Sequence, residues 1–424
     1  MKIAVVGLWH LGTVTASALA AEGHDVIALD SAEIVASLNG GSVPVDEPGL
    51  RELIAEQRAA GRLRFAAAPA DASGAELVWF TYDTPVDDDD NADVAFVIES
   101  ALAFLAAFPG EAVVAISSQV PVGSGAQIAA RAGDRFRFAA IPENLRLGSA
   151  IAYFRKPDRF VVGTADAGAR EVIGRALAFA PEIVWMGLEA AEMTKHAINA
   201  FLATSVVFAN ELAAICERVG ADAREVERGL KSDLRVGPKA YVRAGEAFAG
   251  GTLARDVGFL SALGARDGVA VDQVRATATS NERHRNWPYE RVRAALAAVG
   301  GSRVALLGLV YKPGTDTLRA STAVALARQL RADGVTVVAF DPAIPAGDAR
   351  LDGIADVAGS AAAALAHADV VAIGTAWPEF KALPAAAFAN ARGGVVDVGR
   401  VLEATAGAAG VPYFAFGRPD TVRA

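Results

Sequence analysis

Short apolar runs alternate with amphipathic stretches over residues 1 to about 185. The runs that are apolar throughout, or nearly so, predict strands buried on both faces at Ile3–Val6, Asp25–Ala28, Leu77–Phe80, Val113–Ile116 and Phe160–Val162. Between most of them apolar residues recur at helical spacing, for example over Thr13–Ala21 and Ala95–Phe108. This alternation is typical of a parallel sheet covered by helices on both faces.

The pattern changes near Glu189. From there to about Val219 the periodicity is helical without proline or glycine, and a second helical region extends to about Leu263. A helix that long usually bridges domains or packs against a partner subunit. From about Arg303 the strand–helix alternation returns, through Val337–Phe340, Val370–Ile373 and Val395–Val396. We therefore predict an α/β fold with two Rossmann-like doubly wound domains joined by a long central helix and helical region. The expected domains are residues 1–188, 189–298 and 299–424.

Two stretches near opposite ends of the chain begin in the same way. Each is a run of buried-strand residues that stops at a glycine, Gly7 in the first and Gly308 in the second, and then enters a helical pattern. A strand, a glycine turn and a helix N-terminus place backbone N–H groups and the helix dipole where they can hold phosphate. The two starts predict two nucleotide-type sites with a reaction between them.

Composition agrees with a large enzyme. The 424 residues suffice for two or three domains, each with a core. Mean hydropathy is +0.31, yet no uninterrupted apolar stretch approaches the ~20 residues of a membrane-spanning helix, and Met1 leads straight into a strand rather than a signal peptide. A net charge of -9 argues against a nucleic-acid partner. The single cysteine, Cys216, excludes an intrachain disulfide framework and fits a reducing cytoplasm. The acidic run at residues 87–90 has no nearby His or Cys, so we predict a solvated loop and no metal site.

The first glycine motif predicts a dinucleotide site. In Gly7-Leu-Trp-His-Leu-Gly12 the first glycine permits the tight turn and the last permits close helix–strand packing. The middle glycine, which normally lets pyrophosphate approach the backbone, is replaced by Trp9. Asp30 ends the second strand about 20 residues on, where an acidic residue binds the adenosine ribose and favours NAD over NADP. The alternative for this segment alone is an ordinary strand–helix–strand unit without ligand.

Several ordered segments carry a family resemblance. They include Thr84-Pro85, Pro142-Glu-Asn-Leu-Arg146, Glu192-Met-Thr-Lys195 through Asn199, Arg235-Val-Gly-Pro-Lys239, and Gly308-Leu-Val-Tyr-Lys312 through Arg319. Across nearly its whole length the chain resembles the UDP-glucose/GDP-mannose dehydrogenase family. The resemblance implies an NAD-binding domain, a central helical dimerisation region and a nucleotide-sugar-binding domain. It also implies a homodimer, a UDP-sugar substrate and a role in polysaccharide biosynthesis. Members of that family oxidise the C6 alcohol of a nucleotide sugar to a carboxylate with two NAD, through a thiohemiacetal and a thioester on a cysteine.

The resemblance implies catalytic roles for Lys195, Asn199, Asp256 and Glu143. Lys195 and Asn199 are four residues apart, so they share one helix face, where an ammonium and an amide can stabilise charge that develops on oxygen as hydride leaves. Asp256 can take a proton directly or through water. On an arbitrary helix such a pair would be a solvated face, and an aspartate after two glycines would be a turn residue or a cap.

The remaining site residues fall into two groups. The implied cofactor-binding residues are Gly7, Trp9, His10, Leu11, Gly12, Asp30, Thr84, Pro85 and Ser118. The implied substrate-binding residues are Arg235, Phe248, Gly250, Gly251, Lys312 and Arg319. Diphosphate charge explains the basic members of the second group, which would otherwise be surface charges.

The sequence departs from the family where the covalent chemistry occurs. The family loop reads Gly-Gly-Ser-Cys-Phe-Pro-Lys-Asp, whereas this chain has Gly250-Gly-Thr-Leu-Ala-Arg-Asp256, one residue shorter and without cysteine. Cys216 lies on a predicted helix and is interpreted as a buried structural thiol. Thr252 is a poor substitute because an alcohol ionises far less readily than a thiol. Where the family motif has an acidic residue this chain has Leu147, and where another family motif has a threonine it has Gln119. We predict that the covalent route to the acid is lost while the hydride-transfer groups remain.

Three hypotheses follow. The first is an NAD-dependent nucleotide-sugar oxidoreductase that stops at an aldehyde or ketone, uses oxidised NAD transiently, or oxidises an aldehyde hydrate without a covalent intermediate. The second is a conventional acid-forming 6-dehydrogenase with a variant loop. The third is a non-catalytic binding homologue. Lys195, Asn199 and Asp256 disfavour the third, and the missing cysteine disfavours the second. The base and the sugar stay open.

Overall fold

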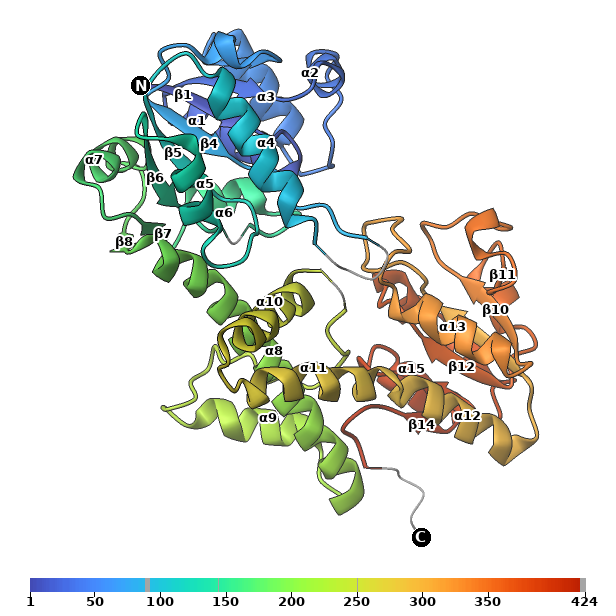
Figure 1. The fold of residues 1–424 in the computed structure, drawn as a ribbon. Helices are drawn as coiled ribbons and strands as arrows, with labels where there is room; N and C mark the ends of the chain where they lie inside the picture. The colour runs from blue at the N-terminus through green and yellow to red at the C-terminus, as the bar shows by residue number, and fades with distance from the viewer. Residues whose placement is uncertain (88–91, 144, 250, 420–424) are drawn as a thin grey trace. The chain divides into compact units, whose positions relative to one another are not determined.

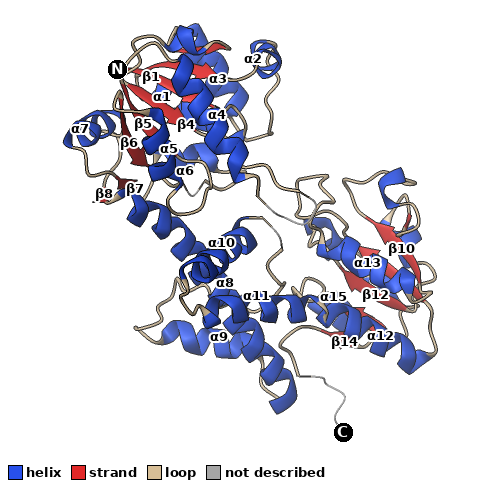
Figure 2. Cartoon of the chain, viewed as in Figure 1, coloured by secondary structure: helices blue, strands red, loops and turns tan. Residues whose placement is uncertain are grey.

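A computed structural model describes residues 1–87, 92–143, 145–249 and 251–419. The chain divides into two compact units, Met1–Ile198 and Asn199–Ala424, and the long helix α8 (Leu188–Val219) belongs in part to each. Figure 1 traces the chain through both units, and Figure 2 shows that helices flank the sheet of each.

The first unit is built on an eight-stranded sheet with the order β3-β2-β1-β4-β5-β6-β7-β8. Neighbouring strands are parallel except β6 and β7, which pair antiparallel through Ala140 and Gly163. The strands are β1 (Lys2–Val6), β2 (Asp25–Leu29), β3 (Leu63–Ala66), β4 (Leu77–Phe80), β5 (Ala112–Ile116), β6 (Phe136–Ala140), β7 (Phe160–Gly163) and β8 (Ile183–Met186). The helices are α1 (His10–Ala21), α2 (Ala32–Asn39), α3 (Leu50–Ala59), α4 (Val94–Ala107), α5 (Ser124–Ala132), α6 (Ala150–Arg155) and α7 (Ala167–Ala176).

Both faces of this sheet are buried, which explains its continuous apolar strands. On β1, Ile3 and Val5 belong to the core that includes side chains of α1, α6 and α7. Ala4 and Val6 belong to the opposite core, which includes side chains of α4 and α5. Because successive strand residues point to opposite faces, no position from Ile3 to Val6 can be polar without losing burial energy, about 1.5–3 kcal/mol for a large aliphatic side chain.

The second unit combines helices with a six-stranded, fully parallel sheet of order β11-β10-β9-β12-β13-β14. Its strands are β9 (Arg303–Leu307), β10 (Thr336–Phe340), β11 (Asp356–Val357), β12 (Val370–Ile373), β13 (Gly394–Val396) and β14 (Tyr413–Phe414). Its helices, besides α8, are α9 (Ala223–Ser232), α10 (Thr252–Asp267), α11 (Asp272–Arg285), α12 (Trp287–Val299), α13 (Thr322–Ala332), α14 (Ala361–Leu365) and α15 (Glu403–Ala409). The strand order reverses between β9 and β12, and in such sheets ligands bind outside the carboxyl ends of the strands at this point.

Helix α8 is 32 residues long and apolar, and by length and composition alone it could cross a membrane. Its most apolar window has a mean hydropathy of 1.5, and 44% of that window is buried inside the structure. Ala191 and His196 are buried in the first unit, and Ala203 and Ala213 in the second. Residues of α8 are therefore buried in both units.

The predicted fold class is confirmed, and the strands named from the sequence begin and end within one residue of the observed ones. Three details differ. The sheet of the first unit is not wholly parallel, because β7 runs against β6. The second helical region is not continuous: residues 233–251, which include Gly237, Pro238 and Gly245, separate α9 from α10. The second glycine turn does not lead directly into a helix, because Pro313 and Gly314 follow it and α13 begins only at Thr322.

Candidate active site

The turn after β1 has the geometry of a dinucleotide cradle despite its missing middle glycine. Gly7 has φ +95°, which favours glycine, and a Cβ on Gly12 would lie 1.8 Å from the Gly7 carbonyl oxygen. Trp9 precedes α1 with φ -81°, an ordinary value for any residue, and its side chain is 47% exposed. The tryptophan therefore causes no backbone strain. The first turn of α1 has backbone N–H groups without helical partners, including those of His10 and Leu11. These donors make the N-terminus of α1 a place where an anion can bind.

Asp30 lies at the end of β2 against this turn. Its carboxylate accepts hydrogen bonds from the amides of Leu8 (2.5 Å) and Ser31 (2.7 Å). A carboxylate has about four acceptor positions, so others stay available to ribose hydroxyls. The predicted ribose-binding role of Asp30 therefore fits its position.

His10 is held by a residue to which the sequence analysis assigned no role. Glu47 is buried, and its carboxylate lies 3.0 Å from His10 Nε2. The same carboxylate accepts hydrogen bonds from the amides of Gly148 (2.7 Å) and Ala150 (2.8 Å). Glu47 thus fixes the start of α1 against the start of α6. A buried acid with three partners far apart in sequence leaves no local sequence signal.

Three further predicted cofactor residues lie near the carboxyl ends of β4 and β5. Thr84 is buried, and its hydroxyl donates a hydrogen bond to the Gln119 carbonyl (2.7 Å). Ser118 is also buried, and within residues 1–87, 92–143, 145–249 and 251–419 its Oγ has no hydrogen-bond partner. Pro85 is exposed, and its carbonyl accepts from the Asp93 amide (2.8 Å). A buried hydroxyl without a partner is unusual in native proteins, and a bound ligand would satisfy it. Together with the glycine turn and Asp30, Ser118 fits NAD.

Lys195 lies on α8 within the first unit. Its Nζ donates a hydrogen bond to the backbone carbonyl of Glu143. The Glu143 carboxylate instead accepts from the amide of Leu145. The structure therefore brings the two predicted catalytic residues together, but through the backbone of Glu143 rather than its carboxylate.

One turn before Lys195, α8 is joined to the loop that follows β5. Glu192 is buried and accepts hydrogen bonds from the amides of Gly123 (2.7 Å) and Gly125 (2.8 Å), at the start of α5. His196 Nε2 donates to the Val120 carbonyl (3.1 Å). Burial raises the pKa of Glu192, and the two amide donors oppose that rise. These contacts set the position of α8 relative to the loop after Ser118.

Asn199 and Asp256 form a buried pair in the second unit. Asn199 Nδ2 donates a hydrogen bond to the Asp256 carboxylate, and Asp256 is fully buried. Asp256 lies on the second turn of α10, which begins at Thr252 after Gly251, whose φ is +87°. The fold thus brings together two residues 57 positions apart that sequence reasoning selected separately.

A large crevice in the second unit adjoins this region. It encloses about 1320 Å³, including the part open to solvent. It lies outside the carboxyl ends of β9, β12 and β13, at the switch point of the sheet. The residues that line it are Val206, Tyr241, Glu246–Ala249, Thr252, Leu253, Tyr311–Pro313, Ala320, Thr322, Ile373–Ala376, Gly399 and Val401. Phe248 and Lys312, both predicted to bind substrate, are among them.

The Phe248 backbone is held in place by Asn281. The Phe248 amide donates to Asn281 Oδ1 (3.0 Å), and Asn281 Nδ2 donates to the Phe248 carbonyl (2.8 Å). Asn281 is a positioning residue that sequence reasoning missed, because an asparagine within a polar helical segment has no distinguishing signal.

The second glycine turn is in contact with Asp341 and Thr375 of the same unit. Asp341, at the end of β10, accepts hydrogen bonds from the amides of Leu309 (2.6 Å) and Val310 (3.1 Å). A Cβ on Gly308 would lie 2.3 Å from the Thr375 amide nitrogen, so the turn also packs tightly against the segment after β12. Two of the amides of this turn are therefore bound by Asp341 in this structure.

The other predicted substrate residues are not assembled in the crevice. The Arg235 side chain is 89% exposed and pairs with Asp233 (2.8 Å). Arg319 is adjacent to Ala320, which lines the crevice, but Arg319 itself does not. Gly250 lies outside the described residues. Cys216 is buried on α8 among apolar side chains including Ala213, and burial raises the pKa of its thiol. It is not among the residues that line the crevice.

Comparison with known proteins agrees with this arrangement. The sequence matches three domains of the UDP-glucose/GDP-mannose dehydrogenase family: the NAD binding domain over residues 1–177, the central domain over 189–283 and the UDP binding domain over 305–404. A UDP-glucose 6-dehydrogenase of Rhizobium meliloti is 35% identical over 399 residues, covering 90% of this chain and 91% of that protein. One of Pseudomonas aeruginosa is 34% identical, covering 90% and 89%. A UDP-glucose dehydrogenase structure from Pyrobaculum islandicum superposes with a TM-score of 0.82 at 32% identity, covering 94% and 93%.

These matches extend over all three parts of the chain and confirm the predicted nicotinamide cofactor and nucleotide-sugar ligand. The chain belongs to the UDP-glucose/GDP-mannose dehydrogenase family.

Proposed function

We propose that this protein oxidises a UDP-sugar with NAD and forms no covalent intermediate on cysteine. The observation that carries the proposal is the buried Asn199–Asp256 pair in the UDP-binding unit. In addition, a threonine stands at the start of α10, and Cys216, the single cysteine of the sequence, is buried in the core. The groups for hydride transfer are present, whereas no thiol lines the crevice among the described residues.

Each residue has a distinct role in the proposed reaction. When bound, NAD supplies the hydride acceptor. As the hydroxyl of the reacting sugar carbon loses its proton, negative charge develops on its oxygen, and the Lys195 ammonium and the Asn199 amide stabilise that charge until hydride leaves the carbon. Asp256 takes the hydroxyl proton directly or through water. The products of this step are a carbonyl sugar, NADH and a proton.

The crevice suits the rest of the substrate. Lys312 supplies positive charge for a diphosphate, and Phe248 supplies an apolar wall. The unpaired thiol and the nicotinamide cofactor are consistent with a cytoplasmic location, which we include in the proposal.

Product stoichiometry tests the proposed chemistry. We expect at most one NADH per sugar consumed, with a carbonyl sugar or an epimer as product, because no sulfur nucleophile is available for the second oxidation. The measurement is NADH absorbance with mass spectrometry of the sugar products from UDP- and GDP-sugars. Two NADH per sugar with a uronate would contradict a reaction that stops after one oxidation, and would support either a conventional 6-dehydrogenase or the oxidation of an aldehyde hydrate. Tight binding without turnover of any sugar would support a non-catalytic homologue.

We further propose that the protein is a homodimer formed through α8. Phe201, Phe208 and Ile215 are spaced by seven residues on this helix and are 71%, 47% and 57% exposed. A seven-residue spacing puts them on one side, and contiguous exposed apolar side chains mark interaction surfaces. The Arg235 side chain is 89% exposed and pairs with Asp233 in this protomer; we propose that it reaches across the dimer.

A charged side chain placed among these three exposed apolar residues tests whether they form the dimer interface. Phe208→Glu is expected to convert the protein to monomers, because a glutamate buried between two apolar helices would be desolvated without a partner. Light scattering coupled to size-exclusion chromatography measures the mass. Phe96→Glu is the matched control, since Phe96 is 44% exposed on α4. A Phe208→Glu protein with the mass of the wild type would exclude this face as the interface.

A further inference from the structure

An acidic residue lies on the wall of a crevice that must accept a diphosphate. Glu246 is exposed and lines both the crevice and a smaller adjoining pocket of about 390 Å³. With every described residue considered, its carboxylate forms no hydrogen bond or ion pair within the chain. Acidic groups repel phosphate, so an unpaired carboxylate here requires another function.

The backbone on both sides of Glu246 is fixed. The Gly245 amide donates to Asn210 Oδ1 (2.9 Å), and the Gly245 carbonyl accepts from His284 Nε2 (2.6 Å). Two residues after Glu246, Asn281 holds Phe248 through both backbone groups. Glu246 is therefore presented from a rigid segment.

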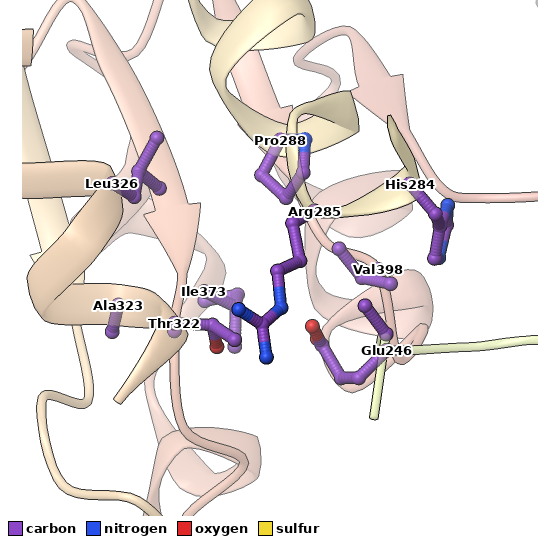
Figure 3. Close-up of a pocket in the computed structure, with 11 residues that line it drawn as sticks. Glu246, His284, Arg285, Pro288, Thr322, Ala323, Leu326, Ile373 and Val398 are labelled. Atoms are coloured by element: carbon purple, nitrogen blue, oxygen red, sulfur yellow. The ribbon is translucent and has the colours of Figure 1, made fainter. Parts of the chain in front are cut away.

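The smaller pocket is polar at one end. Figure 3 shows Glu246, Arg285 and Thr322 directed toward the same space. Arg285 pairs with Glu282 (3.1 Å) and donates to the Phe248 carbonyl (3.3 Å), while its buried Nε has no partner among the described residues. The pocket thus offers a carboxylate acceptor, a guanidinium donor and a hydroxyl at one place.

This polar group lies apart from the reacting end of the crevice. The smaller pocket shares Glu246, Ala247 and Thr322 with the crevice, but Thr252 and Lys312 do not line it. A nucleotide sugar is an extended molecule with its diphosphate between sugar and nucleoside. On the proposed function, the sugar lies toward Thr252 and the diphosphate at Lys312, so the nucleoside occupies the part of the crevice beside Glu246.

Burial raises the pKa of the Glu246 carboxyl to about 8, and the charge of Asp397 adds to the rise. In its neutral form the carboxyl keeps a carbonyl oxygen that accepts a hydrogen bond. Because the residue is exposed to the open crevice, solvent offsets part of the effect of burial. His284 donates to the Gly245 carbonyl, and Arg285, whose guanidinium points toward the same space as Glu246, pairs with Glu282; among the described residues neither forms an ion pair with Glu246.

We propose that Glu246 determines specificity for the nucleoside half of the substrate by accepting a hydrogen bond from it. A uracil ring presents an N3–H donor and a ribose presents vicinal hydroxyls, and a carboxyl oxygen accepts from either. Apart from solvent-open space the smaller pocket has a volume of only about 20 Å³, room for about one water molecule, so we infer that an edge of a nucleoside lying in the crevice, rather than a ring system inside the pocket, meets Glu246. This inference rests on the proposed function, because that function places the nucleoside.

Binding of UDP and two analogues tests the proposal without requiring turnover. Calorimetric affinities would be measured for UDP, N3-methyl-UDP and 2′-deoxy-UDP with the wild type, Glu246→Ala and Glu246→Gln. We expect the wild type to bind one analogue about tenfold more weakly than UDP, since that analogue lacks the donor of the hydrogen bond to Glu246. In Glu246→Ala, the affinity for UDP should fall by a similar factor, and the difference in affinity between UDP and that analogue should disappear. Glu246→Gln, which keeps an acceptor oxygen, should restore part of it.

The outcomes separate this inference from the proposed function. The analogue whose discrimination is lost identifies the donor, N3–H or ribose hydroxyl. Glu171→Ala, at an exposed position on α7, is the control for a glutamate-to-alanine change and should leave all three affinities unchanged. If Glu246→Ala binds UDP as tightly as the wild type, or keeps the wild-type discrimination, the inference is wrong while the proposed function stands. If the wild type binds no UDP, both fail.

Discussion

Lys195→Ala is expected to lower kcat by about 10²–10³-fold, the range seen when one preorganised oxyanion-stabilising donor is removed. The side chain supplies the positive charge nearest the developing alkoxide in the proposed mechanism. Its Nζ donates a hydrogen bond to the backbone carbonyl of Glu143. Initial rates of NADH formation measure kcat, and thermal unfolding verifies the fold.

Cys216→Ser is the control for this experiment. The thiol packs against Ala213, Ala223 and Phe416 and does not line the crevice, so activity should stay nearly unchanged. A large loss of activity in Cys216→Ser would show that the thiol takes part in the chemistry. A Lys195→Ala protein with wild-type kcat would remove Lys195 from the mechanism.

Asp256→Asn is expected to reduce kcat by about 10²–10⁴-fold, the usual contribution of a positioned acid–base group. Asparagine has nearly the shape of aspartate and keeps a side-chain oxygen for the Asn199 amide, but it cannot take a proton at neutral pH. The hydrogen bond that joins α8 to α10 should therefore survive while the chemistry does not.

Asp256→Ala separates the structural part of the effect. It leaves the Asn199 amide buried without its acceptor, at a cost of about 1–3 kcal/mol in the free energy of unfolding. Asp256→Asn should unfold at nearly the wild-type temperature and Asp256→Ala at a lower one, with both inactive. If Asp256→Asn retained full activity, the proton acceptor would have to be another group.

The two doubly wound sheets share a local design and use it differently. In each, an aspartate at the end of the second strand accepts hydrogen bonds from the glycine turn after the first. Asp30 takes the amide of Leu8, whereas Asp341 takes those of both Leu309 and Val310 and also accepts from Trp377 Nε1 (3.1 Å). The first turn keeps donors for pyrophosphate on α1. In the second unit, the ligand-sized space lies instead among Lys312, Phe248 and the segments after β12 and β13.

The local pattern of apolar and polar residues was sufficient to predict the architecture. Buried parallel strands need unbroken apolar runs and end at turns, so Leu77–Phe80 and Val370–Ile373 were located to the residue. The α8 boundaries follow from a stretch without proline or glycine. The Gly7–Gly12 turn and Asp30 are also local signals, because their roles depend on backbone geometry within one strand–helix–strand unit.

Contacts between distant residues could not be read from the chain. The Asn199–Asp256 pair, the Glu47 and Glu192 carboxylates on distant amides, and the closure of the second turn by Asp341 all join residues far apart in sequence. A carboxylate has the same local pattern whether it meets solvent, an amide or a ligand, and only folding selects its partners. For that reason the family resemblance indicated which residues belong to the site, while the fold showed that Glu143 presents its carbonyl to Lys195 and that Glu246 faces the crevice.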